Sequence, residues 1–318
     1  MRHMPALGGF RCAQLLRVTV GVCLVALVLG GWGDLVAQSQ SFNIGLALAC
    51  AALYPVSFVL MLAVWLRMTT LQVGGRDWRR HVLIYCRTNL VRGLPLGLFW
   101  RVGGRVLQYD KLSVPRSAVV AVSLWEIALH STAAALLLCI TLLLRPVVIG
   151  VWLPGFAVLL AVSSVAVLAY RHGGPPPRVV LAAAVPGSIG AWRGLLQGRL
   201  GAVAGILGAY AITWLNAGLM LLLLVRAVAP QAAFDFVDGT QVWAVAGLAG
   251  YVAFLLPFLD VGAKEATMTV LLTAHMAPSL AVVIAILWRL VFTVCDIACS
   301  LTGLLAMRWL GAIEGQTE

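Results

Sequence analysis

Four ionisable residues stand inside stretches that are otherwise apolar. Glu126 and Arg289 each lie about ten residues into a long apolar run. His130 follows Glu126 by one helical turn, and Asp296 follows Arg289 by two, so each pair shares a helix face. A charge near the middle of a bilayer costs roughly 2.5–3.5 kcal/mol on insertion scales. We therefore expect these side chains to face the protein interior rather than lipid.

Two interpretations of these residues remain open. In the functional one, Glu126 pairs with Arg289, and His130 and Asp296 extend the pair into a polar track for a proton or a lipid headgroup. In the alternative, the pair is a buried salt bridge that only fixes helix packing, and His130 is an ordinary core residue.

Arginine far outnumbers lysine, with 20 Arg and 2 Lys. A guanidinium can hold a phosphate through two parallel hydrogen bonds, which an ammonium cannot. Arg101 and Arg105 follow a proline break in the stretch 80–112. They are candidates for binding an anionic headgroup, and the alternative is that their charges only set membrane topology.

A second stretch, 240–277, has the same plan, with Lys264 and Glu265 after its break. We expect these two residues either to hold a headgroup at the other membrane face or to pair within the protein. Such a break predicts two short helices that form a re-entrant hairpin. A hairpin of this kind persists at membrane depth only when it is buried or lines a wet cavity. The expected break residues are Pro95, Gly97, Gly104, Pro257 and Gly262.

The composition places these residues in a membrane protein. Of 318 residues, 62% are hydrophobic and 10% are charged, whereas soluble domains average about 45–50% apolar and about 25% charged residues. A spanning helix needs about 20 mostly apolar residues. The predicted spans are 18–36, 44–66, 117–144, 147–170, 202–225 and 279–307. The first resembles a signal sequence, and we expect it to remain as an uncleaved helix.

Basic residues are concentrated in two segments. Segment 67–116 holds ten basic residues against two acidic ones, and segment 171–199 holds four basic residues and no acid, whereas 35–43 has no basic residue. The positive-inside rule places both basic segments and both termini in the cytoplasm. Six spans with two hairpins satisfy this arrangement, and eight full spans do too.

The chain contains an internal repeat, in which 115–126 matches 278–289 at an offset of 163 residues. With six spans, the first hairpin enters from the cytoplasm and the second from outside, which is the inverted-repeat plan of many secondary transporters. We therefore expect an all-α polytopic membrane protein with six to eight transmembrane helices in two inverted repeats. One integral membrane domain, 1–318, would comprise an N-terminal span (1–43), repeat 1 (44–144), a linker span with a cytoplasmic loop (145–201) and repeat 2 (202–308).

Several kinds of site are not expected. The net charge of +11 and the pI of 9.9 are explained by topology-setting loops, so we expect no nucleic-acid partner. Cys295 and Cys299 lie one helical turn apart, but no histidine stands at metal-ligand spacing. We expect no metal and no cofactor.

A set of short motifs resembles the lysylphosphatidylglycerol synthase transmembrane, or flippase-domain, family of bacterial membrane proteins. The first set is Leu94-Pro95, Gly97, Trp100, Gly104-Arg105 and Glu126, and the second is Leu256-Pro257, Gly262, Glu265 and Trp288-Arg289-Leu290. The resemblance extends over roughly 40–308. The first break reads Pro-Leu-Gly where the family usually has Pro-Gly, and Phe258 and Leu259 replace the usual glycines of the second.

The resemblance implies a two-repeat domain in the bacterial inner membrane that moves lipids between leaflets. Full-length synthases add an aminoacyl-transferase domain, and this chain stops at Glu318, so we do not expect an enzyme. The function expected is flippase-like translocation of an anionic or polyprenyl-linked lipid. The alternatives are a non-catalytic scaffold for a lipid- or glycan-modifying enzyme and an intramembrane transferase. The expected partner is membrane lipid, and a membrane enzyme or a second copy of the chain stays open as a further partner.

Overall fold

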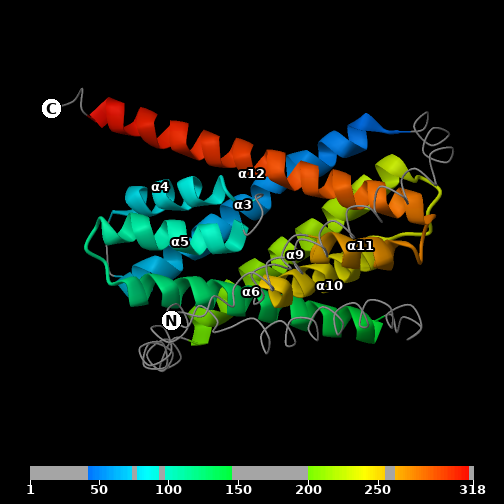
Figure 1. Cartoon of the computed structure of the whole chain (residues 1–318), viewed down its shortest axis with the longest axis horizontal. Coiled ribbons are helices and arrows are strands. Elements are labelled where there is room, and N and C mark those ends of the chain that lie inside the picture. Colours follow the sequence, from blue (N-terminus) through cyan, green and yellow to red (C-terminus); the bar gives the residue numbers. More distant parts are fainter. Residues whose placement is uncertain (1–41, 74–76, 93–96, 145–199, 255–261, 315–318) are drawn as a thin grey trace, which may run out of the picture. The chain divides into compact units, whose positions relative to one another are not determined.

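The computed structural model of the chain describes residues 42–73, 77–92, 97–144, 200–254 and 262–314. Within these residues every regular element is an α-helix (Figure 1). The helices are α3 (Ile44–Val73), α4 (Trp78–Asn89), α5 (Gly97–Asp110), α6 (Arg116–Leu144), α9 (Leu200–Val228), α10 (Phe236–Phe254), α11 (Ala263–Leu272) and α12 (Pro278–Glu314).

Four of these helices, α3, α6, α9 and α12, are long and apolar enough to cross a membrane, with qualifying stretches of 28 to 33 residues. At about 1.5 Å per residue, such lengths exceed the roughly 30 Å of hydrocarbon in a bilayer. The four correspond to the predicted spans 44–66, 117–144, 202–225 and 279–307. The predicted spans 18–36 and 147–170 lie outside the described residues.

Large apolar side chains remain on the outside of the long helices. Leu143 of α6 and Leu305 of α12 are exposed, as are several of their neighbours on these helices. An exposed apolar face of this extent is unfavourable in water and favourable against lipid tails. The exposed set therefore agrees with a membrane-embedded protein.

The described residues fall into two compact units, and each combines parts of both predicted repeats. Unit 1 contains 42–53, 133–144, 214–254 and 262–290. Unit 2 contains 54–73, 77–92, 97–132, 200–213 and 291–314.

In unit 2 the stretch predicted as the first hairpin forms two helices, α4 and α5, which pack against each other. Asp77 caps α4 by accepting a hydrogen bond from the backbone N–H of Arg80 at 3.3 Å. Gly104, expected at the break, lies inside α5 instead. A Cβ there would lie 3.2 Å from Cγ2 of Thr88. The lack of a side chain at Gly104 therefore lets α4 and α5 approach closely. The break residue Pro95 lies outside the described residues.

In unit 1 the second stretch likewise forms two packed helices, α10 and α11. Gly262 is the N-cap of α11 and has a φ of 99°, in the left-handed region that glycine adopts without strain. Gly218 of α9 lies against α10, because a Cβ on it would be 2.8 Å from Cα of Thr240. Small residues at such crossings let membrane helices approach closely. Pro257 lies outside the described residues.

Candidate functional site

Helix α5 buries both of its arginines and exposes two of its large apolar side chains. Arg101 and Arg105, four residues apart and so on one face, are only 3% and 0% exposed, whereas Trp100 and Leu107 are 53% and 66% exposed. A surface helix in water has the opposite arrangement. Burying arginines and exposing leucine is favourable where the surroundings are lipid and the interior offers a countercharge.

The countercharge is Glu126 of α6, which is 2% exposed. Its Oε2 accepts a hydrogen bond from Nη1 of Arg105. Its Oε1 lies 3.7 Å from Nη1 of Arg101, within ion-pair range but beyond a hydrogen bond. Glu126 therefore neutralises Arg105 closely and Arg101 loosely.

Two aromatic residues complete the surroundings of Arg105. Its guanidinium carbon lies 3.6 Å from the ring centre of Trp65 on α3 and 5.5 Å from that of Tyr85 on α4. Both rings are fully buried. A guanidinium over a desolvated Trp face gains about 2 kcal/mol or more. We call Arg101, Arg105, Glu126, Trp65 and Tyr85 the guanidinium cluster.

The guanidinium cluster has more positive than negative charge and more donors than acceptors. It holds two guanidiniums and one carboxylate. Nε and Nη1 of Arg101, Nε and Nη2 of Arg105, Oε1 of Glu126 and the Tyr85 hydroxyl are buried and make no hydrogen bond. Burial, and then the charge of Glu126, raises the pKa of Tyr85, so its hydroxyl keeps its proton. Each unsatisfied buried group costs about 1–3 kcal/mol, so an incoming anion would relieve several at once.

A second buried carboxylate in unit 2, Asp296 of α12, has its own partners. It accepts a hydrogen bond from the hydroxyl of Tyr54, and Nδ2 of Asn89 lies 3.4 Å from the same oxygen. Nη1 of Arg92 lies 3.5 Å away. Sequence reasoning missed Tyr54 and Asn89, since neutral residues on separate helices carry no spacing signal.

His130 of α6 lies in the buried part of unit 2. Its Nε2 is 3.5 Å from Oγ1 of Thr213, and its ring meets Tyr210 edge-on at 4.8 Å. These contacts fit a core histidine that packs between α6 and α9.

The remaining expected site residues lie in unit 1. Arg289 donates a hydrogen bond to Glu265, and both side chains are partly exposed. Nζ of Lys264 lies 3.6 Å from the ring centre of Trp243, whose ring in turn meets Trp288 at 4.8 Å.

Glu126 and Arg289 thus have partners other than the expected ones. Each pairs with a residue of the short helix that precedes its own long helix, 21 positions earlier for Glu126 and 24 for Arg289. The two pairs have opposite order of charge, because the arginine is on the short helix in one and on the long helix in the other. The sequence match between 115–126 and 278–289 carried no information on these local partners.

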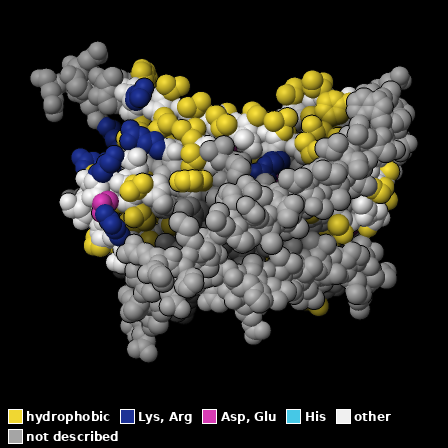
Figure 2. All heavy atoms as spheres, viewed as in Figure 1, with side chains coloured by type: hydrophobic (Ala, Val, Ile, Leu, Met, Phe, Trp, Pro, Cys, Tyr) yellow, Lys and Arg dark blue, Asp and Glu magenta, His cyan; other side chains and the backbone are white. Residues whose placement is uncertain are grey.

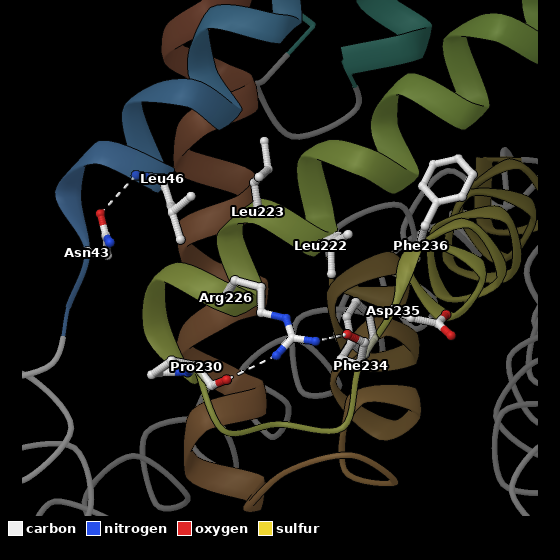
Figure 3. A pocket seen from close by; sticks show the side chains of 9 residues that line it. All are labelled: Asn43, Leu46, Leu222, Leu223, Arg226, Pro230, Phe234, Asp235 and Phe236. Atoms are coloured by element: carbon white, nitrogen blue, oxygen red, sulfur yellow. Dashed lines mark hydrogen bonds between the residues drawn. The ribbon is translucent and has the colours of Figure 1, made fainter.

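A pocket of about 440 Å³ also lies in unit 1, lined mainly by leucine, proline and phenylalanine side chains (Figure 3). The pocket is also lined by Arg226, whose guanidinium donates hydrogen bonds to the carbonyl oxygens of Pro230 at 3.0 Å and Phe234 at 2.9 Å. Arg226 therefore closes the loop after α9, and the pocket is a weaker candidate for an anion than the guanidinium cluster.

The outer surface of unit 2 is basic. Figure 2 shows Lys and Arg side chains gathered around α4 and α5. Among the described residues of this unit, the exposed basic ones are Arg67, Arg80, Arg87, Lys111, Arg116 and Arg308. Such a surface fits anionic headgroups at a membrane boundary.

Within the described part of the chain, no three His, Cys, Asp or Glu side chains lie close enough to hold a metal ion. Cys295 and Cys299 are half-buried thiols. Comparison with known proteins adds no relative, because neither a family model nor a curated protein matches this chain.

Proposed function

We propose that this protein moves an anionic lipid between the leaflets of a bacterial inner membrane and that the guanidinium cluster binds the lipid's phosphate. One observation carries the proposal. Arg101 is almost fully buried, its nearest carboxylate is 3.7 Å away and is shared with Arg105, and its Nε and Nη1 make no hydrogen bond. A phosphate oxygen would accept from these donors and balance the charge.

A lipid suits the surroundings of the cluster better than a soluble anion does. The outward face of α5 is apolar at Trp100 and Leu107, so acyl chains would lie against it while the phosphate enters between the helices. The basic surface of unit 2 would raise the local concentration of anionic lipid.

The distribution of basic residues supports the proposed topology. Ten basic residues stand in 67–116 and four in 171–199, and the positive-inside rule assigns both segments to the cytoplasm. On this basis the first hairpin would lie at the cytoplasmic face and the second at the external face, as in inverted repeats. Membership in the lysylphosphatidylglycerol synthase flippase-domain family is proposed on the same grounds.

The test compares wild-type protein with Arg101→Gln and with a matched control, Arg87→Gln, which removes the same charge from the exposed side of α4. Each protein is purified gently, and the lipid it retains is identified by native mass spectrometry. We expect an anionic lipid on the wild type, at most a small loss from the control, because five other exposed basic residues remain on that surface, and at least about a tenfold loss from Arg101→Gln, which corresponds to about 1.4 kcal/mol. Equal retention by all three proteins would contradict the assigned site.

A second assay tests movement. The proteins are reconstituted in vesicles with fluorescent phosphatidylglycerol, and a membrane-impermeant quencher reports how fast lipid leaves the inner leaflet. Wild type and Arg87→Gln should accelerate the exchange and Arg101→Gln should not. Binding without accelerated exchange in any protein would favour the scaffold function instead.

A further inference from the structure

The position of Glu126 raises a question about its role, because a site for an anion holds a carboxylate of its own. Oε2 is engaged by Arg105, whereas Oε1 makes no hydrogen bond and lies 3.7 Å from Arg101. A carboxylate that served only to stabilise burial of both arginines would be expected to hydrogen-bond both. This one holds Arg105 and leaves Arg101 loosely paired.

We infer that Glu126 competes with the bound phosphate for Arg101 and thereby sets an affinity low enough for release. The inference rests on the proposed function. Before the lipid arrives, Oε1 is the only charged acceptor near Arg101 in the described part of the cluster. When a phosphate bonds to Nε and Nη1 of Arg101, it must lie within a few ångströms of the Glu126 carboxylate. Like charges at that distance repel strongly in a partly dehydrated site.

The division of labour between the arginines follows. Arg105 stays with Glu126 and the Trp65 ring, so it is a fixed element of the cluster. Arg101 exchanges between Oε1 and the phosphate. A translocation site has to bind well enough to load and weakly enough to unload, and an internal anion that returns to Arg101 provides the second requirement.

The inference makes two opposite predictions for neighbouring residues. Arg101→Gln should weaken binding of an anionic lipid, whereas Glu126→Gln should tighten it, although both variants remove one charge from the same cluster. If Glu126 only held the fold together, its loss would weaken binding or leave it unchanged.

The experiment measures binding of dioleoyl phosphatidylglycerol to delipidated protein in detergent. Wild type, Arg101→Gln and Glu126→Gln are compared, and Asp77→Asn is the control, because it removes an exposed carboxylate while asparagine can still cap α4. We expect the Kd of Glu126→Gln to fall at least about tenfold below wild type and its leaflet exchange to slow, with Asp77→Asn unchanged in both.

Glu126→Gln leaves two buried arginines without a countercharge, and it is at risk of unfolding. A second comparison avoids this difficulty. Arg105→Gln leaves one arginine and one carboxylate, and Arg105→Gln with Glu126→Gln leaves Arg101 alone. The double variant should bind phosphatidylglycerol at least about tenfold more tightly than Arg105→Gln. Equal or weaker binding by the double variant, or by Glu126→Gln, overturns the competition.

Two further ligands separate the sources of the effect. Diacylglycerol has the same chains without a phosphate, and its binding should be the same in all variants. Inorganic phosphate should displace phosphatidylglycerol only at much higher concentration. If inorganic phosphate binds as tightly as phosphatidylglycerol, the site takes a soluble anion and the lipid assignment falls. If Arg101→Gln binds phosphatidylglycerol as wild type does, the proposed headgroup site falls, and the competition falls with it.

Discussion

Arg105 lies over the ring of Trp65, with the guanidinium carbon 3.6 Å from the centre of the indole ring. The same guanidinium donates a hydrogen bond to Glu126, so it contacts both a ring and a carboxylate. A buried arginine needs both kinds of contact, because the carboxylate balances its charge and the ring replaces water above its flat surface. Trp65 is therefore part of the electrostatics of unit 2 as well as of its packing.

Replacing Trp65 should show this double role. Trp65→Leu removes the ring and leaves a cavity, and we expect the free energy of unfolding to fall by about 3–5 kcal/mol. Trp65→Phe keeps an aromatic face and should lose clearly less. Thermal unfolding in detergent, followed by circular dichroism, measures both. Equal losses for Leu and Phe would mean that the face of the ring contributes nothing to Arg105.

Two tyrosines of unit 2 should respond in opposite ways to loss of the hydroxyl. Tyr54 donates to the buried Asp296, and a hydrogen bond to a charged group contributes about 1.5–3 kcal/mol. Tyr54→Phe should lower stability by that amount. The hydroxyl of Tyr85 makes no hydrogen bond, so Tyr85→Phe should leave the lipid-free protein as stable as wild type or more so. The two melting temperatures, measured after delipidation, decide the matter, and a large loss in Tyr85→Phe would show a partner for its hydroxyl.

Two glycines of α9 should differ sharply when they are replaced by alanine. A Cβ on Gly218 would lie 2.8 Å from Cα and 2.9 Å from N of Thr240, whereas one on Gly208 meets nothing within 4 Å. Gly218→Ala forces α9 and α10 apart and should cost about 1–3 kcal/mol of stability. Gly208→Ala should be neutral or slightly stabilising, because alanine favours the helix. Thermal unfolding of the two variants side by side is the measurement, and equal stability would contradict the close crossing.

Stability should fall in mild acid partly through His81 of α4. Burial lowers the pKa of His81 below its ordinary value, and its Nδ1 lies 2.6 Å from the hydroxyl of Tyr109. Burial also raises the pKa of Tyr109 to about 12, so the tyrosine keeps its proton in its contact with the imidazole. The unfolded chain then binds the His81 proton more readily than the folded one. The stabilisation is complete above the unfolded pKa of about 6.5 and is lost as the pH falls below it.

The variant His81→Asn tests this contribution. Unfolding of wild type and His81→Asn is measured at about pH 7.5 and pH 5.5, on either side of the ordinary histidine pKa. The wild type should lose more stability between the two than the variant does. An identical loss in both proteins would assign the acid sensitivity to other groups.

The long helices were predictable because uninterrupted apolar runs of this length are typical of membrane-spanning helices. The inward face of α5 was also within reach, since Arg101 and Arg105 are one turn apart and neither can face lipid. The partners of these residues were not predictable. Trp65 and Tyr85 are neutral, stand on separate helices and have no spacing that relates them to Arg105. Glu126 was identified by its charge, but its partner depends on how α5 lies against α6, and no local pattern encodes this tertiary contact.

The reversed polarity of α5 also bears on how the protein enters the membrane. Arg101 and Arg105 precede Glu126 in the chain, so they reach the membrane before their countercharge does. Each unpaired arginine opposes insertion by roughly 2.5–3.5 kcal/mol at the bilayer centre. The pair α4 and α5 should therefore wait at the membrane surface, where the exposed arginines of α4 meet anionic headgroups, until α6 is in place. Biogenesis would then follow an order that differs from the order of the chain.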